Sequence, residues 1–385
     1  MSAAAACPYT VVRDPDTVRD ILHRPDDFSP ANALLAVTPL SGQALRVLQK
    51  ARFALPPVLA SNPTASHAGI RKVVAGFFTP AKVAAMEHRI HQLAREAAEA
   101  AKVRLAASGQ VDLVQAVAAN PPAVIMMEML GLPVRDLAQL KAWSLDSLEL
   151  FWGWPDPARQ LVLAHSAAAF YAWLRELVLD AVTAGSDDEP GAPNLFRALA
   201  DHGLTIPEIC SLGYFLLIAG QETTTQLIST TLFRLLEGSR GMTWEEASSG
   251  ARARDIVRHI LATESSVPTW RRVAVRDTEL AGQAVSAGDE ILMELTGNHG
   301  FPWPADSGLS SVSGGTGRAG PTPFGLAFGS GIHRCLGAKL AELETAIIIQ
   351  ETAAALPGIR LDESAPEWLR LLSFQAPRMV VAHGA

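Results

Sequence analysis

Cysteine and long apolar stretches are both scarce in this 385-residue chain, and their scarcity narrows the class of protein. Only Cys7, Cys210 and Cys335 occur, widely spaced and without a Cys-x-x-Cys pair. That pattern argues against a disulfide framework or a cysteine zinc site and favours a reducing compartment. No apolar run reaches about 18 residues, so we expect no membrane span. The N-terminal residues lack a basic stretch followed by an apolar one, so we expect a cytoplasmic protein without a signal peptide.

Basic residues are also in the minority. Lysine and arginine total 32 against 39 aspartates and glutamates, a net charge of −7, which argues against nucleic acid as a main partner. Apolar residues make up 49% and charged residues 18%, as in an ordered globular protein that buries a large core.

The order of helical and strand-like patterns predicts a mainly α fold with small β-sheets. A short strand precedes a helix that begins near Asp14, and residues 30–66 then read as an irregular surface segment. Helical patterns cover residues 67–78, 79–107, 113–131, 134–151, 157–184, 207–237, 244–263 and 336–356. Residues 270–294 alternate as strands do. No repeat or linker divides the chain, so we expect one domain over residues 1–385.

The segment FGSGIHRCLG, residues 328–337, places Cys335 in a glycine-rich turn at the start of a helical pattern. Helix N-termini present unpaired N–H groups and positive partial charge, and both lower the pKa of a thiol. The neighbours are small or basic: Gly329, Gly331, Gly337, His333 and Arg334. A flat, bulky group could approach such a backbone closely. The alternative for a lone cysteine is a structural, buried thiol.

The pattern Phe328-x-x-Gly331-x-x-x-Cys335-x-Gly337 resembles the haem-binding signature of the cytochrome P450 superfamily. The resemblance implies that Cys335 is the proximal thiolate ligand of the iron in haem b, iron protoporphyrin IX. It implies that Phe328 packs near the sulfur side of the haem, with Gly329 and Gly337 beside the cofactor. His333 matches a position that commonly meets a haem propionate.

A second segment, LLIAGQETTTQLIST at residues 216–230, lies in the longest helical pattern. Gly220 leaves room for a ligand, Thr223 can hold a hydroxyl over that space, and Glu222 can relay protons. The alternative is a polar notch in a core helix. The segment resembles the oxygen-activation segment of the same family, which implies that Glu222 and Thr223 are catalytic and that Ala219 and Gly220 contact the haem.

Two further basic positions match the family. His67 and Arg71 are four residues apart and share a helix face, which on its own also fits a solvated polar surface. The resemblance implies that this pair and Arg272 bind the haem propionates, as cations facing carboxylates do. Similar segments follow one another in order from about residue 9 to residue 380, which extends the resemblance to nearly the whole chain.

One motif of the family is missing, the Glu-x-x-Arg pair that braces the cysteine loop. The corresponding positions hold His259 and Ala262. Asp255 and Arg258 offer a possible substitute one helical turn earlier, and Arg318 a possible third partner. The N-terminus is short and lacks the first helix of the family. The resemblance therefore predicts a rebuilt proximal side.

We expect a haem-thiolate monooxygenase that acts on a small apolar organic substrate of secondary metabolism, with electrons from a separate ferredoxin-type donor. The donor is expected at the proximal face near Arg334 and Lys339. Wall candidates for the substrate are Leu34, Leu35, Val37, Leu40 and Phe53. Two alternatives remain open: a haem-thiolate enzyme that uses peroxide or rearranges its substrate without electrons, and a non-catalytic binding module.

Overall fold

The computed structural model describes residues 9–183, 194–238, 241–296, 325–364 and 366–384. Cys7 and Arg318 lie outside these ranges. The long helices are α1 (Pro15–His23), α2 (Gly42–Lys50), α3 (Ser66–Ala75), α4 (Pro80–Ala85), α5 (Glu87–Ser108), α6 (Asn120–Met129), α7 (Leu137–Trp152), α8 (Pro157–Thr183), α9 (Leu195–Asp201), α10 (Ile206–Glu237), α11 (Gly250–Thr263) and α12 (Ala338–Ala355). Shorter helical turns are η1 (Val114–Ala118), η2 (Glu246–Ser248) and η3 (Gly331–His333). The prediction of a mainly α fold is confirmed.

The strands form small sheets, also as predicted. The largest has the order β1-β7-β4-β2, with β1 parallel to β7 and the other pairs antiparallel. Its members are β1 (Thr10–Val12), β2 (Phe28–Ser29), β4 (Thr269–Ala274) and β7 (Glu290–Glu294). The others are β5 (Thr278–Leu280) with β6 (Gln283–Val285), β9 (Trp368–Arg370) with β10 (Gln375–Pro377), and the order β3-β11-β8 of β3 (Gln110–Asp112), β11 (Val381–His383) and β8 (Arg360–Leu361).

Two helical predictions need correction. Residues 30–66 contain α2, because the Ser41 hydroxyl caps the helix by accepting from the Ala44 N–H and because Ala44 and Leu48 bury one face. The single helix expected over residues 79–107 is two helices, α4 and α5, which meet at Met86.

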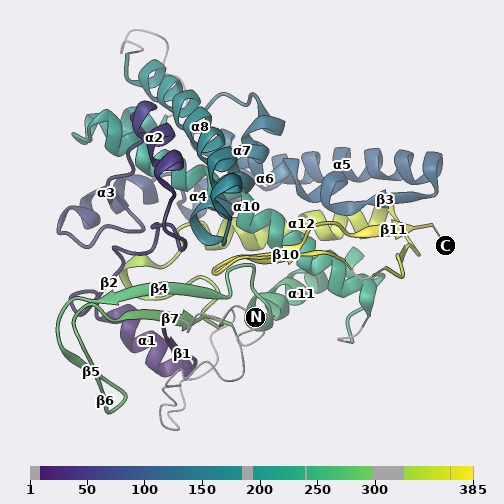
Figure 1. Cartoon of the computed structure of the whole chain (residues 1–385). Coiled ribbons are helices and arrows are strands. Elements are labelled where there is room, and N and C mark those ends of the chain that lie inside the picture. Colours follow the sequence, from purple (N-terminus) through teal and green to yellow (C-terminus); the bar gives the residue numbers. More distant parts are fainter. Residues whose placement is uncertain (1–8, 184–193, 239–240, 297–324, 365, 385) are drawn as a thin grey trace.

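Helix α10 runs through the middle of the molecule (Figure 1). A reciprocal pair of contacts between Thr205 and Glu208 caps its first turn, and Gly238 ends it in the left-handed conformation. Most of its 32 residues are buried, as its apolar pattern predicts. The long helix therefore forms a rigid wall to which other segments can be fitted.

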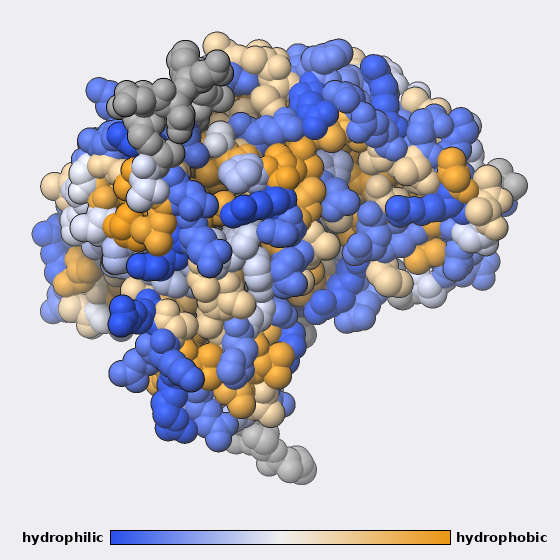
Figure 2. Space-filling model, turned by 90° about the horizontal axis from the view of Figure 1, so that it is seen from above, coloured by the Kyte–Doolittle hydropathy of each residue, from blue (hydrophilic) through white to orange (hydrophobic). Residues whose placement is uncertain are grey.

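Helices share one large hydrophobic core, while α1 packs on the four-stranded sheet in a smaller core of its own. Figure 1 shows α1, β1, β4 and β7 together at one end of the molecule, away from α5. Seen from above, apolar side chains lie in small patches broken by polar ones (Figure 2). Within the described ranges, no helix is long and apolar enough to cross a membrane.

Candidate functional site

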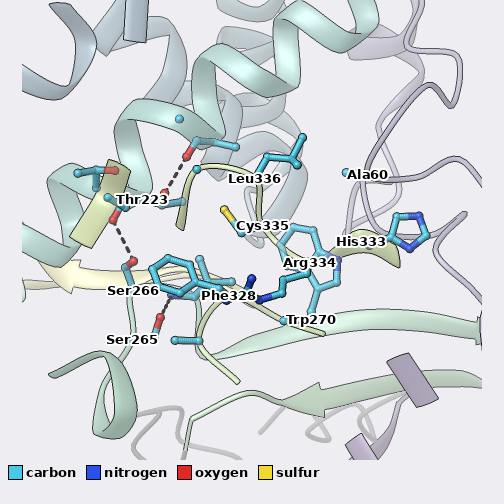
Figure 3. Close-up of a pocket in the computed structure, with 18 of the residues that line it drawn as sticks. Ala60, Thr223, Ser265, Ser266, Trp270, Phe328, His333, Arg334, Cys335 and Leu336 are labelled. Carbon is cyan, nitrogen blue, oxygen red and sulfur yellow. Dashed lines mark hydrogen bonds between the residues drawn. The ribbon is translucent and has the colours of Figure 1, made fainter. Parts of the chain in front are cut away.

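A large cavity lies between α10 and the loop that carries Cys335 (Figure 3). The space open to the centre of a water-sized sphere is about 250 Å³, whereas one water needs roughly 10–15 Å³. Its apolar wall comes from the segment between α2 and α3, from α10, from the segment between α11 and β4, from β4, and from the residues after β7 and before β10. It comprises Leu59, Phe215, Leu216, Leu227, Val267, Trp270, Leu295 and Phe374. The cavity is therefore built for an organic ligand far larger than water.

The cysteine loop, residues 328–337, faces this cavity. Its backbone closes by a hydrogen bond from the Cys335 N–H to the Phe328 carbonyl at 2.9 Å, and the sulfur points inward (Figure 3). Cys335 lies two residues before Gly337, the N-cap of α12, so it precedes the first helical turn. The sulfur is exposed, but to the inside of the cavity.

The pKa of the Cys335 thiol departs from the prediction. Burial raises it, and this effect outweighs the N–H groups of Gly337 and Ala338 and the charges of Arg71 and Arg334, which lower it. The expectation of a lowered pKa is thus wrong for the protein without a cofactor. A bound metal ion would supply the missing positive charge.

The glycines of the loop have different reasons for being there. A Cβ on Gly331, whose φ is +68°, would lie 2.3 Å from the Leu22 carbonyl oxygen, so this glycine permits contact with α1. A Cβ on Gly337 would lie 3.9 Å from the Cys335 sulfur. Gly337 thus lies beside the sulfur, although a Cβ there would make only an ordinary contact with it, and Gly329 with its φ of +66° shapes the turn.

Two arginines at one end of the cavity have no acidic partner in the described part of the chain. Arg272 is 3% exposed and donates to the Arg271 carbonyl at 2.8 Å. Burial lowers its pKa to about 10. Arg71 donates to the Arg334 carbonyl, and burial lowers its pKa too. Buried charge without a counter-charge is costly, so this end of the cavity favours an anionic ligand.

Two imidazoles accompany these arginines. The rings of His67 and His333 lie 4.4 Å apart, and His333 Nε2 is 3.4 Å from the Asn62 carbonyl oxygen. Burial, followed by Arg272, lowers the pKa of His333 to about 3, and burial and Arg71 lower that of His67. His67 Nε2 is buried without a hydrogen-bond partner. His67, Arg71, Arg272 and His333 are called the cationic end below.

The predicted haem fits this arrangement. In the described ranges no three His, Cys, Asp or Glu side chains cluster as they would at a metal site. A porphyrin would bring its own ligands to a metal at Cys335, and its two propionates are the anions that the cationic end lacks. Phe328, Gly329, His333, Cys335 and Gly337 all line the cavity, as do Arg71 and Arg272. His67 is absent from the lining, and its ring lies 4.4 Å from that of His333.

The structure separates the predicted catalytic pair. Thr223 lines the cavity, where its hydroxyl donates to the Ala219 carbonyl at 2.7 Å. Glu222 is buried and turned toward α7, with its Oε1 2.6 Å from Lys141 Nζ. Lys141 was not predicted, although it is the one basic residue of α7.

Gly220 has a different partner from the one expected. A Cβ there would lie 1.8 Å from the terminal methyl of Met126 in α6. The space beside this glycine is thus filled by a thioether, although Gly220 and Ala219 do line the cavity. Met126 carries no sequence signal that distinguishes it from an ordinary core residue.

The predicted substrate wall is wrong. Leu34, Leu35, Val37, Leu40 and Phe53 are absent from the cavity lining. Leu35 is 61% exposed, and Phe53 packs on Tyr171 and Tyr214. The same segment contributes Leu59 and Ala60 instead. The larger wall residues, Trp270 and Phe374, lie beside each other with their ring centroids 6.2 Å apart.

A buried acid at the cavity was also missed. Glu344 of α12 lines it, is 1% exposed, and has no hydrogen-bond partner for Oε1 in the described ranges. Burial raises its pKa well above the ordinary value. In the sequence it resembles an ordinary helix-surface glutamate.

Asp255 and Arg258, the possible substitute for the missing Glu-x-x-Arg pair, have other partners among the described residues. Arg258 Nε contacts Glu342 Oε1 of α12 at 2.6 Å, and Asp255 lies 4.0 Å from Arg252. His259 and Ala262 are exposed, and Arg318 lies outside the described ranges. Within those ranges, no hydrogen bond or ion pair links these four positions of α11 to the cysteine loop.

Comparisons with known proteins agree with this site. No protein-family model matches the chain. The putative cytochrome P450 YjiB of Bacillus subtilis (strain 168) is 30% identical over 304 residues, 76% of this chain and 72% of that protein. The cytochrome P450 monooxygenase PikC of Streptomyces venezuelae is 29% identical over 320 residues, 80% of this chain and 71% of that protein.

Solved structures agree as well. A complex of cytochrome P450 CREJ with (4-ethylphenyl) dihydrogen phosphate superposes with a TM-score of 0.84 and 26% identity, over 100% of this chain and 94% of that one. With a cysteine that lines a large cavity and these relatives, the chain belongs to the cytochrome P450 family, as a haem-dependent oxidoreductase of the monooxygenase class.

Proposed function

We propose that the chain binds haem b through Cys335 and oxidises a small, uncharged, apolar organic molecule, with O₂ and electrons from a separate ferredoxin-type donor in the cytoplasm. The observation that carries this proposal is the division of one cavity into a cationic end and an apolar wall, with Cys335 opening between them. The haem supplies the redox-active iron at which oxygen is activated.

Each end has its own part in this proposal. Arg71, Arg272 and His333 receive the propionates, which relieves the cost of burying guanidinium groups that have no acidic partner among the described residues. The apolar wall receives the substrate, and the charged side chains that line the cavity in the described ranges, Arg71, Arg272, Arg334 and Glu344, lie on other segments than Leu59, Phe215 and Phe374 of that wall. A charged substrate would therefore lose its hydration without finding a counter-charge there.

Proton delivery involves Thr223 and Glu222. The Thr223 hydroxyl faces the cavity, whereas the Glu222 carboxylate is paired with Lys141. For Glu222 to pass a proton toward the cavity, its carboxylate has to leave Lys141 and turn toward Thr223. The ion pair thus keeps the Glu222 carboxylate turned away from the substrate until it takes part in proton transfer.

The substrate class is proposed from the wall and from the relatives. One relative is named erythromycin C-12 hydroxylase, from Saccharopolyspora erythraea, and is 29% identical over 77% of this chain. We propose a product of secondary metabolism as the substrate here too. Exposed Arg334 and Lys339, on the cysteine side, are the proposed contact for the electron donor.

The test uses purified, haem-loaded protein. We expect apolar ligands to shift the spin state, carboxylate analogues not to, and product to form only with O₂, ferredoxin, its reductase and NAD(P)H. Product formed with peroxide alone, or without any oxidant, would replace this proposal with one of the two non-reductive alternatives. No thiolate-type band in the reduced carbon monoxide complex would leave only a binding module.

A matched pair of threonines sharpens the test. Thr223 and Thr231 of α10 both donate to a backbone carbonyl four residues earlier at 2.7 Å, but only Thr223 lines the cavity. Thr223→Ala is expected to release peroxide instead of product while the haem spectrum stays normal. Thr231→Ala is expected to behave as the unmodified protein does.

A further inference from the structure

The cysteine loop contacts the end of helix α1, and this contact does not involve the positions of the missing Glu-x-x-Arg pair. We propose that the C-terminal end of helix α1, through the Leu22 carbonyl and the His23 imidazole, positions the loop that presents Cys335. The inference rests on the proposed haem-thiolate function, but its structural part concerns only the loop and α1.

The first contact is a backbone approach that excludes any side chain. A Cβ on Gly331 would lie 2.3 Å from the Leu22 carbonyl oxygen and 3.2 Å from its carbonyl carbon. Real Cβ atoms essentially never come within 3.0 Å of such an atom, so even alanine would push the loop away from α1. The φ of +68° at Gly331 adds strain for any other residue.

The second contact is a hydrogen bond between the residue after Leu22 and the residue before Gly331. His23 Nε2 lies 2.7 Å from Ser330 Oγ, so the last residue of α1 is tied to the residue before Gly331. Because it is partly open to solvent, we expect it to contribute less than the backbone contact. The two contacts together locate the turn four to five residues before Cys335.

The end of α1 is itself anchored, which makes it suitable as a support. Arg24, which follows the helix, donates to Thr278 Oγ1 at 2.6 Å and to the Glu279 carbonyl at 3.0 Å. It also bonds Asp20 and Asp27 at 2.9 and 2.8 Å. The loop is therefore connected through α1 to strand β5.

Helix α11, by contrast, offers the loop no such contact at the family positions. His259 and Ala262 are exposed, and Arg258 instead reaches Glu342 of α12. Helix α3 contributes one further restraint, from Arg71 to the Arg334 carbonyl. The support for the turn ahead of the cysteine thus comes from α1.

The test compares His23→Ala, Ser330→Ala, their double variant and Gly331→Ala with Arg19→Ala. Arg19 is a matched control because it lies on α1 and pairs only with Asp16 of the same helix at 2.6 Å. His23→Gln keeps a donor for Ser330 and serves as the conservative rescue.

Two measurements are made on the full-length protein. The first is the rate at which the reduced carbon monoxide complex loses its thiolate-type Soret band in mild urea. The second is hydrogen exchange of the peptide that contains the Gly329 and Cys335 amides, measured with and without haem. A protein unable to ligate haem through Cys335 fails the first measurement in its unmodified form, whereas the second still tests the contact with α1.

We expect Gly331→Ala to speed both processes about tenfold or more. The two single side-chain changes should each speed them roughly two- to fivefold, and the double variant no more than either, because they remove one bond. His23→Gln should restore the original rates. The proposal is overturned if His23→Ala and Ser330→Ala match Arg19→Ala in both measurements, or if their effects simply add.

Discussion

The cationic end and the apolar wall of the cavity differ in whether they need a bound ligand to be stable. At the cationic end, Arg272 is nearly fully buried and donates to a backbone carbonyl. At the apolar wall, Trp270 and Phe374 already pack on each other and on Trp152 without needing a ligand. The first end is thus unfavourable until an anion arrives, and the second is complete as it stands. Cofactor binding and substrate binding should therefore respond differently to mutation.

The largest effect of a mutation is expected at Cys335. Cys335→Ser should abolish the thiolate-type band of the reduced carbon monoxide complex and all monooxygenase activity, since a hydroxyl is a poor substitute for the thiolate. Cys210→Ser is the control, because that thiol is buried in the large core outside the cavity. A normal spectrum in Cys335→Ser would show that Cys335 is not the iron ligand.

At the cationic end, one substitution should act in opposite directions on the two forms of the protein. Arg272→Leu removes a buried charge, so the haem-free protein should gain stability in urea unfolding. Haem transfer to an acceptor globin should meanwhile become about 10- to 100-fold faster, the effect of losing a charge-assisted hydrogen bond. If both forms lose stability together, Arg272 is a structural residue and not a propionate ligand.

The apolar wall should show a smaller and simpler effect. Trp270→Ala is expected to weaken apolar ligands about 3- to 10-fold in spin-state titrations, the typical worth of an aromatic contact. The rate of haem loss should stay as it is. Trp154→Ala, at a tryptophan that is 51% exposed, should leave ligand affinity unchanged. Equal effects of the two variants would show that Trp270 is not part of the substrate wall.

The smallest effect concerns Glu344, between the two ends. Because burial raises its pKa, the folded protein keeps a proton that the unfolded chain releases above its ordinary pKa of 4.5. The stability that this group contributes is therefore present below pH 4.5 and is lost as the pH rises. Glu344→Gln should flatten that decline in urea unfolding of haem-free protein as the pH rises above 4.5.

Glu363→Gln is the control for this prediction, because Glu363 is exposed on the surface. It should leave the pH profile of unfolding as it is in the original protein. An identical profile for Glu344→Gln would mean that the carboxyl of Glu344 is ionised in the folded protein.

Short-range patterns predicted the cysteine loop well and the rest of the cavity poorly. Residues 328–337 act within one turn, so their spacing alone indicated a ligand loop. The pair Glu222 and Thr223 shows the limit, because neighbours on a helix project about 100° apart. Thr223 faces the cavity and Glu222 faces Lys141, a residue 81 positions earlier in the chain.

Long-range packing also explains where the glycines lie. Gly220 lines the cavity beside Met126, whereas Gly331 approaches Leu22 and is absent from the lining. No local pattern connects α6 to α10, or α1 to the cysteine loop, because these contacts exist only after the elements have packed. The prediction of substrate-wall residues within 30–66 was wrong for the same reason. Which residues of that segment face the cavity depends on how the segment packs, and packing brings Leu59 there.

The amino-acid sequence alone determined the helical class, through its periodicity, and the cysteine that lines the cavity, through the spacing of residues within one turn; Arg71, Arg272 and His333 were expected at the cavity from the family resemblance. Tertiary structure decided which of these groups remain without a partner, which acid turns away, and which helix supports the loop. Those outcomes depend on burial and on contacts between segments far apart in the chain. A buried charge is costly only where the packed fold excludes water. A glycine is required only where the packed fold brings two backbones together.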